Sequence, residues 1–217
     1  MSHDPHQGFF SFWSRFYEAT PLLGPLIRAQ QDLALARLAA RPGEKLLDLG
    51  CGPGRGLTAL RGAGCTPVGL DTSAEMLGEA RHAGAVVRAS AALLPLRSGV
   101  LDGILCTNSF HHYPEPLATL RELRRVLKPG GRLVLVDPNA ESIGARLAIY
   151  GGEALTFGLD VHLHTRAAWR AMCRDAGFAS CEVETLGGPL GELARGVPVA
   201  GRLAELAATS LMVTARA

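Results

Sequence analysis

Hydrophobic positions along the chain follow two patterns that meet near residue 43. Between residues 22 and 38, leucine and isoleucine recur at intervals close to the helical repeat, and a Pro-Gly pair at 42–43 ends the pattern. From Lys45 onward, short apolar runs of four to seven residues recur, each bounded by Gly, Pro or Asp. The first pattern predicts helix, and the second predicts strands that alternate with helices.

The first five apolar runs alternate with stretches of helix-forming residues. The expected strands are 46–49, 67–70, 85–87, 101–106 and 132–136, and the expected helices between them are 57–61, 74–82 and 117–127. Strands that are apolar throughout are typical of a parallel sheet with helices on both faces. The alternation therefore predicts an α/β fold.

The last third of the chain has a different pattern. It loosens over 138–164, then predicts a helix at 167–176 and two further strands at 181–186 and 210–215. Gly and Pro are frequent between those two strands, which favours a long connection without a crossover helix, and so an antiparallel pair. The sequence thus predicts one domain, 1–217, around a mostly parallel seven-stranded sheet whose last strand is antiparallel.

Length, charge and cysteine content exclude several classes of protein. No apolar run reaches the length of a membrane-spanning helix, and the N-terminal MSHDPHQGFF lacks the features of a secretory signal. The net charge of +2 gives no basic surface for nucleic acid or anionic lipid. Five cysteines without a CxxC pair favour reduced thiols in a cytoplasmic protein over disulfides or structural zinc.

A glycine-rich turn is the sharpest local signal. The strand at 46–49 runs into glycines at Gly50, Gly52 and Gly54, and a helix follows. Glycine allows a tight turn and lets a ligand approach the backbone, while the helix directs free N–H groups toward an anionic group. The spacing is G-x-G-x-G, which is neither the dinucleotide-binding nor the P-loop pattern. Such a turn can also serve packing alone.

Asp71 ends the second predicted strand, 17 residues after Gly54. A carboxylate in this place can accept two hydrogen bonds from a ribose diol. The alternative is that Asp71 caps the next helix, a role for which Thr72 and Ser73 also compete. Together with the glycine turn, Asp71 indicates a ligand that contains a nucleoside.

Several motifs in order carry a family resemblance. LLDLGCGPG, VGLDTSAEML, LDGILCTNSFHHYPEP and LRRVLKPGGRLVLVDP resemble the class I S-adenosylmethionine-dependent methyltransferases, in particular the small-molecule branch with ubiquinone and menaquinone C-methyltransferases. The resemblance covers residues 17–137, and more weakly continues to 177–178. It implies a Rossmann-like, doubly wound fold, S-adenosylmethionine as cofactor and methyl transfer as the reaction.

The resemblance also implies positions that contact the cofactor. Gly50, Cys51 and Gly52 match the cradle of the methionine part, and Asp48 lies near its ammonium. Asp71 matches the acid that binds the ribose. Two further residues, Thr72 and Met76, match positions that flank ribose and adenine, although Met76 also suits ordinary helix packing.

Other cofactor positions follow from the resemblance or from the end of a strand. Ser90 and Ala91 align with a segment in which the family commonly has an Asp, at the position of Ser90, that accepts from the adenine amino group. Thr107 and Asn108 follow the fourth strand, at the edge where α/β sheets bind ligands. Tyr17 resembles an aromatic residue that closes over the sulfonium, unless the N-terminal aromatic residues only pack a helix.

Histidines supply the candidates for proton transfer. Methyl transfer from a sulfonium needs mainly positioning and exclusion of water, so a base is required only where the acceptor loses a proton. His112 is the predicted catalytic residue, with His111 as its neighbour, and a purely structural role is the alternative. The pair His162 and His164 lies two residues apart in the 138–164 segment, but no carboxylate spacing supports a metal site, so none is expected.

Two apolar segments point to the acceptor. Residues 1–42 are expected to form an N-terminal helical cap and residues 138–164 a lid insertion, and both are rich in large apolar side chains. They predict a small, apolar or aromatic methyl acceptor, although ordinary packing explains their apolar content equally well. The small net charge and the lack of a long apolar run predict neither nucleic-acid binding nor integral membrane association, and the oligomeric state stays open. Two alternatives are a phospholipid N-methyltransferase at the membrane surface and a protein that binds S-adenosylmethionine without turnover.

Overall fold

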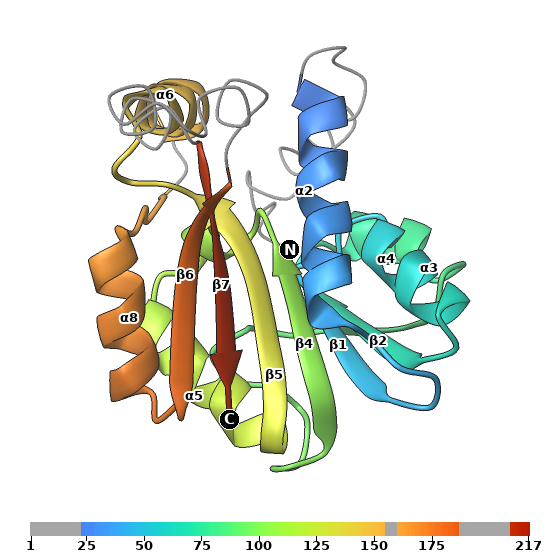
Figure 1. Cartoon of the computed structure of the whole chain (residues 1–217). Helices are drawn as coiled ribbons and strands as arrows, with labels where there is room; N and C mark the ends of the chain where they lie inside the picture. The colour runs from blue at the N-terminus through green and yellow to red at the C-terminus, as the bar shows by residue number, and fades with distance from the viewer. Residues whose placement is uncertain (1–22, 155–159, 187–208) are drawn as a thin grey trace, which may run out of the picture.

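Seven strands form one sheet in the computed structural model, which describes residues 23–154, 160–186 and 209–217 (Figure 1). The order across the sheet is β3-β2-β1-β4-β5-β7-β6. The strands are β1 (Lys45–Leu49), β2 (Thr66–Asp71), β3 (Ala85–Arg88), β4 (Leu101–Thr107), β5 (Leu127–Pro138), β6 (Ser180–Leu186) and β7 (Ser210–Arg216). The first five pair in parallel, whereas β7 is antiparallel to both β5 and β6. The predicted mostly parallel, seven-stranded sheet with an antiparallel last strand is confirmed.

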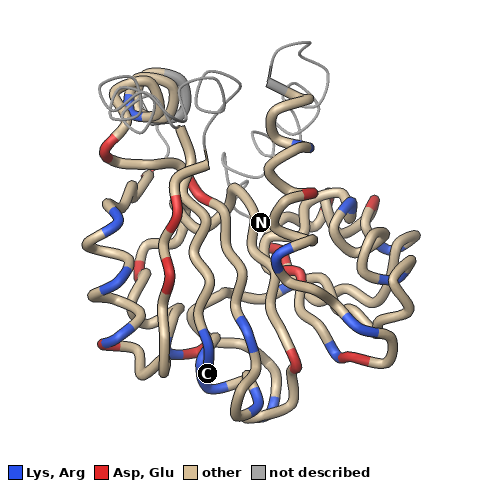
Figure 2. Tube along the Cα trace, viewed as in Figure 1, with Lys and Arg blue, Asp and Glu red and all other residues tan. Residues whose placement is uncertain are grey.

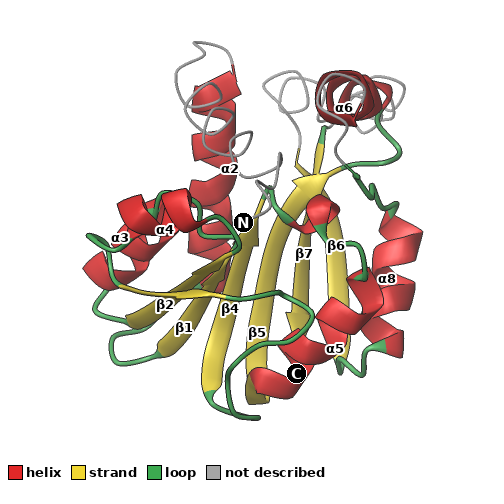
Figure 3. Ribbon diagram, turned by 180° about the vertical axis from the view of Figure 1, so that it is seen from behind, coloured by secondary structure: helices red, strands yellow, loops and turns green. Residues whose placement is uncertain are grey.

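Helices cover both faces of this sheet, which explains why its central strands are apolar throughout (Figures 1 and 3). Leu46 of β1 packs in a cluster with α2 (Leu23–Leu38) and α3 (Arg55–Gly62) on one face. The next residue, Leu47, points to the other face and packs in a cluster with α5 (Pro116–Val126) and α8 (Arg166–Asp175). The sheet is therefore the middle of three layers.

Several element boundaries differ from the sequence prediction. The expected helix 74–82 is α4 (Ala74–Ala80), and the expected helix 117–127 ends one residue earlier because Leu127 already pairs with Leu101 of β4. The ladder between β4 and β5 shifts register and resumes at Gly103 and Arg132, so β5 begins earlier than the apolar pattern indicates. A register shift of this kind leaves little trace in hydrophobicity.

The segment after β5 is more regular than its loose pattern predicts. It contains α6 (Ile143–Arg146), which continues as the π-helix η2 (Leu147–Ala154). Elsewhere in the chain, a short 3-10 turn, η1 (Phe110–His112), follows β4. Ser142 begins α6, and its side chain accepts a hydrogen bond from the Ala145 N–H at 3.3 Å. Among the helices of the described residues, none is both long and apolar enough to cross a bilayer.

The amino ends and the carboxyl ends of the parallel strands, called here the amino edge and the carboxyl edge of the sheet, differ in character. At the amino edge, charged side chains pair with one another: Arg132 binds Glu44 at 2.6 Å, and Lys128 binds Asp102 (Figure 2 marks the charged positions). At the carboxyl edge, the parallel strands end in turns. Because β7 is antiparallel, its first residue, Ser210, lies opposite Pro138 at this same edge.

Candidate functional site

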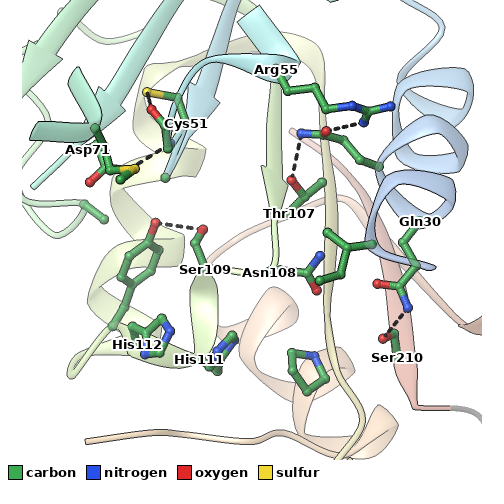
Figure 4. Close-up of a pocket in the computed structure, with 18 of the residues that line it drawn as sticks. Gln30, Cys51, Arg55, Asp71, Thr107, Asn108, Ser109, His111, His112 and Ser210 are labelled. Carbon is green, nitrogen blue, oxygen red and sulfur yellow. Dashed lines mark hydrogen bonds between the residues drawn. The ribbon is translucent and has the colours of Figure 1, made fainter. Parts of the chain in front are cut away.

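A cavity of about 380 Å³ opens at the carboxyl edge of the parallel strands. It lies between the turn after β1, the ends of β2 and β4, and the helical segments α2, α6 and η2 (Figure 4). Open α/β sheets bind ligands at this edge, and the volume is that of a typical small-molecule site. Most of the residues predicted to bind a cofactor line this cavity.

The glycine turn forms one wall of the cavity. Gly50 has φ +66°, and a Cβ atom there would lie 2.3 Å from the hydroxyl oxygen of Ser109. The N–H groups of Gly50 and Cys51 both donate to the Leu70 carbonyl, at 2.8 and 3.1 Å, and so tie the turn to β2. The close approach to Ser109 explains why glycine is required at Gly50.

Asp71 ends β2 beside this turn, as the sequence predicted, and lines the cavity. Its two carboxylate oxygens accept hydrogen bonds from the N–H groups of Gly52, at 3.0 Å, and Ser73, at 2.9 Å. Helix α4 is capped by Ser73, whose side chain accepts from Met76 N–H at 3.3 Å, so Asp71 is not the helix cap. Burial raises the pKa of Asp71, and the backbone hydrogen bonds oppose that rise.

Asp48 lies beneath the turn rather than among the residues that line the cavity. It is 2% exposed, and its Oδ2 has no hydrogen-bond partner among the described residues. A Cβ atom on Gly56 of α3 would lie 2.4 Å from this oxygen, so the helix can pass over Asp48 only with glycine there. Burial raises the pKa of Asp48 to about 7, which the Leu57 N–H opposes.

The remaining predicted cofactor positions fall into three groups. Cys51, Gly52, Thr72, Met76, Ala91, Thr107 and Asn108 line the cavity. Ser90 is exposed and outside the lining set, although Ala89 and Ala91 on either side belong to it, and its hydroxyl accepts from the Ala92 N–H at 3.3 Å. Tyr17 lies outside the described residues. The roles of all these residues in cofactor binding stay predictions.

The end of β4 places polar groups on the cavity floor. Asn108 has φ +52° and donates its N–H to the Val136 carbonyl at 2.8 Å. Asn108 lines the cavity, and its side-chain Nδ2 is buried with no hydrogen-bond partner within the described residues. Ser109, labelled in Figure 4, bridges the Tyr113 hydroxyl and the Cys106 thiol, each at 3.2 Å.

Both predicted histidines line the cavity. Nδ1 of His111 lies 2.8 Å from Oδ1 of Asp137, and the His112 ring lies 4.0 Å from that of His111, centroid to centroid. His164, on the segment before α8, packs against Trp169 instead, and burial lowers its pKa. Among the described residues, no three His, Cys, Asp or Glu side chains are placed to hold a metal ion.

Helix α2 contributes cavity residues that the sequence analysis missed. Gln30 donates to the Ser210 hydroxyl at 2.9 Å, and Gln31 donates to Thr107 at 3.3 Å (Figure 4). Arg55, at the start of α3, binds both Gln31 and Asp32 and so connects α2 to the glycine turn. Two adjacent glutamines between the apolar positions of this helix were the available signal, because such residues need polar partners where the helix meets the core.

Comparison with known proteins identifies the family. A family model described as a methyltransferase domain matches residues 47–135. Over 164 residues the chain is 32% identical to the demethylmenaquinone methyltransferase of Beutenbergia cavernae, covering 72% of this chain and 68% of the relative. This chain belongs to the S-adenosylmethionine-dependent methyltransferases. The resemblance drawn from the motifs is thereby confirmed.

Two further similarities define how far the match extends. This chain is 40% identical over 126 residues to a 37.1 kDa protein of transposon TN4556 in Streptomyces fradiae, covering 54% of this chain and 36% of that protein. It thus spans about a third of that relative's length. An S-adenosylmethionine dependent methyltransferase from Mesorhizobium loti has the same fold, with a TM-score of 0.69, 22% identity, and coverage of 89% of this chain and 97% of that chain.

The residues at the glycine turn fit the family's cofactor. Each Asp71 carboxylate oxygen accepts one backbone hydrogen bond and keeps a further lone pair for a ribose hydroxyl. Gly52 borders open space, where a Cβ atom would meet nothing within 4 Å, so a ligand can lie against its backbone. The orphaned Oδ2 of Asp48 lies under the same turn and suits a cationic ammonium group.

Proposed function

We propose that this protein transfers the methyl group of S-adenosylmethionine to a small, largely apolar or aromatic molecule. The observation that carries the proposal is the form of the cavity, which joins the glycine turn and Asp71 at one end to an apolar wall at the other. The residues of that wall are Leu26, Ile27, Pro138, Ala145, Ala148 and Ile149. A cofactor and an acceptor can therefore share one cavity.

Residues of this chain would hold each reactant and exclude water. When bound, S-adenosylmethionine supplies an electrophilic methyl group on a sulfonium. Asp71 would hold the ribose, and the turn at Gly50 and Gly52 would hold the methionine part near Asp48. Residues 1–42 as a cap and 138–164 as a lid would enclose the acceptor. Positioning of this kind supplies much of the acceleration in a displacement with a good leaving group.

The acceptor class rests on the apolar wall and on the relatives. Side chains such as Ile27 and Ile149 offer no polar partner, so they favour an acceptor that is apolar or aromatic over most of its surface. The Beutenbergia cavernae relative is named for demethylmenaquinone, a ring compound of that character.

The described cysteines are all free thiols, which supports a reducing, cytoplasmic compartment.

Binding and turnover can be measured separately. Calorimetry with S-adenosylmethionine tests the cofactor site, and mass spectrometry tests methyl transfer in a panel of phenols, quinols, amines and phospholipid vesicles. We expect binding, and methylation of a phenolic or quinol acceptor. Binding without any methyl transfer would favour a non-catalytic binding protein, methylation of vesicle lipid alone would favour the phospholipid alternative, and absence of binding would contradict the proposal.

A further inference from the structure

Gln30 is a buried polar residue in the wall of the cavity whose hydrogen-bonding groups are only partly used. It lies on α2, is 5% exposed, and donates from Nε2 to the Ser210 hydroxyl at 2.9 Å. Both residues line the cavity. Within the described residues, the carboxamide oxygen Oε1 of Gln30 has no hydrogen-bond partner. Buried carboxamides ordinarily pair their oxygen as well as their nitrogen, so this oxygen needs an explanation.

The unpaired oxygen faces the cavity. Figure 4 shows the carboxamide nitrogen of Gln30 directed at Ser210, while the oxygen points away from Ser210, on the side where Asn108 lies. Unlike the side-chain nitrogen of Asn108, this oxygen is not among the unpartnered polar atoms that the described part of the protein encloses completely. Because the residue as a whole is buried, the surface that Oε1 retains is surface of the cavity.

The position of Gln30 is fixed from both sides of its contact. One turn further along α2, Ala34 is buried in a cluster with Met212 of β7, which holds the helix against the sheet. Ser210, at the start of β7, pairs with both β5 and β6. The contact therefore joins a packed helix to a strand that is held on both sides. An oxygen held in this way is preorganised for a ligand.

The neighbouring Gln31 shows how a structural glutamine is satisfied in the same wall. Its Nε2 donates to the Thr107 hydroxyl at 3.3 Å, and its oxygen accepts a hydrogen bond from Arg55. Both ends of the Gln31 carboxamide thus connect α2 to other elements. A packing role accounts for the nitrogen of Gln30 in the same way, but it leaves the oxygen of Gln30 unexplained.

The surroundings of Gln30 select the kind of group that its oxygen can bind. A carboxamide oxygen only accepts hydrogen bonds, so the ligand group must be a donor. Leu26 and Ile27 of the apolar wall lie one turn before Gln30 on the same face of α2. Among the described lining residues, Asp71 is the acidic one, and it lies at the glycine turn. A protonated amine would therefore lack an opposite charge beside Gln30, whereas a neutral hydroxyl on a ring needs none.

We infer that Gln30 is a specificity-determining residue whose Oε1, held by Ser210, accepts a hydrogen bond from a hydroxyl group of the methyl acceptor. The inference rests on the proposed function and narrows its acceptor class to ring compounds that carry a hydroxyl group, such as phenols and quinols. An amide oxygen is too weakly basic to take a proton, so Gln30 orients the acceptor and takes no part in proton transfer. A site that pairs a hydroxyl discriminates against an analogue without one, because the protein's own polar group is then left unpaired.

A matched pair of ring probes tests this role without turnover. Phenol and toluene have similar size and shape, and only phenol can donate a hydrogen bond. Saturation-transfer NMR measures their dissociation constants with the full chain saturated with S-adenosylhomocysteine, in wild type and in Gln30→Met, a variant of similar side-chain volume. We expect the preference for phenol over toluene to fall about 3- to 10-fold in Gln30→Met. An equal preference in both proteins, or no phenol binding by wild type, would overturn the inference.

Two further variants separate ligand binding from folding. Gln30→Glu keeps an accepting oxygen at the same reach, so it should retain the preference for phenol even if Gln30→Met lowers stability. Ala36→Met is the matched control, because Ala36 is exposed on α2 and lies outside the described cavity lining, and it should leave both dissociation constants unchanged. A preference that is lost in Gln30→Glu as well would overturn the assignment to Oε1, because the N–H side would then meet the ligand.

Cofactor affinity completes the design. Calorimetry with S-adenosylhomocysteine should give affinities within about twofold for wild type and Gln30→Met. A larger loss in the variant would place Gln30 with the cofactor and overturn the inference. Failure of the proposed function has a different signature, since wild-type protein would then bind no cofactor or methylate no member of the acceptor panel, whereas the preference for phenol is measured from binding alone.

Discussion

The two ends of the cavity are built in different ways. The end that we propose for the cofactor, the cofactor end, consists of one β-α-β unit, in which the backbone of the turn after β1 is hydrogen-bonded to Leu70 and to Asp71 of β2. The end that we propose for the acceptor, the acceptor end, combines α2, the α6–η2 segment and the start of β7, which are far apart in the sequence. Side chains such as Gln30 and Ser210 make the contacts there. Cofactor binding should therefore respond to backbone changes, and acceptor binding to side-chain volume.

The largest effect is expected from Gly50→Ala at the cofactor end. The added Cβ would meet the Ser109 hydroxyl at 2.3 Å, on a residue with φ +66°, so the turn must shift. We expect roughly a 100-fold loss of S-adenosylmethionine affinity and a lower melting temperature. Calorimetry and thermal unfolding measure the two effects. Gly78→Ala in α4 is the control, because that site is open and helical. Unchanged affinity in both variants would contradict the proposal that the turn at Gly50 binds the cofactor.

Asp71→Ala should have the next largest effect. It removes an acceptor of charge-assisted hydrogen bonds to the ribose and leaves the Gly52 and Ser73 N–H groups without their partner. Loss of about 1.5–3 kcal/mol corresponds to a roughly 10- to 150-fold weaker affinity. Titration with S-adenosylhomocysteine provides the measurement. Affinity equal to that of wild type would remove Asp71 from the cofactor site.

At the acceptor end, Ala148→Trp should affect only the acceptor. Ala148 lies on η2 with an exposed side chain at the cavity wall, so a large ring can narrow that end without disturbing the core. We expect KM for a ring acceptor to rise about tenfold, with unchanged cofactor affinity. Ala59→Trp, exposed on α3 and outside the lining set, is the matched control. A change in cofactor affinity without a change in KM would place Ala148 at the cofactor end and contradict the prediction.

The smallest expected effect concerns a proton on Asp48. Its pKa, raised to about 7 by burial, means that the folded protein holds this proton more tightly than the unfolded chain. This contribution to stability is complete below the ordinary pKa of Asp and is lost as pH rises through about 7. A cofactor ammonium nearby favours the ionised form. Binding at pH 6.5 should therefore release up to ~0.8 proton.

Calorimetry in buffers of different ionisation enthalpy measures this release. Asp48→Asn should bind the cofactor with no such dependence on the buffer. An identical proton release in wild type and Asp48→Asn would show that Asp48 does not lie near the ammonium. Burial is the main cause of the raised pKa of Asp48. Without this carboxyl, Asp48→Asn should also lose part of the pH dependence of the free energy of unfolding between about pH 4 and 7.

The contrast between the ends also explains what the sequence could predict. The turn at 50–54 and Asp71 are close in sequence and carry local requirements, namely positive φ and a carboxylate at a strand end, so a motif records them. The strands of the sheet could also be predicted, because each one is a local run of apolar residues. Ser90, in contrast, was assigned by alignment to a motif, and the structure shows it exposed beside the cavity lining.

Pairings between distant segments left no such record. The contact of Gln30 with Ser210 spans 180 positions, and that of His111 with Asp137 spans 26, so neither spacing indicates the partner. Only the tertiary structure shows that the His111 ring, and not the His112 ring, contacts the Asp137 carboxylate. The helical character of 143–154 was missed because its apolar residues do not lie on one buried face: Ala145 and Ile149 are buried and line the cavity, whereas Ile143 and Leu147 are exposed.

A crystal structure of the complex with S-adenosylhomocysteine tests the division of the cavity most directly. The account predicts that the ribose hydroxyls lie on the Asp71 carboxylate, that the homocysteine part follows the turn at Gly50 and Gly52, and that the end lined by Ile27, Ala148 and Ile149 stays open for an acceptor. A ligand that fills this apolar end, or that lies outside the cavity with Asp71 still bonded only to backbone N–H groups, would contradict it.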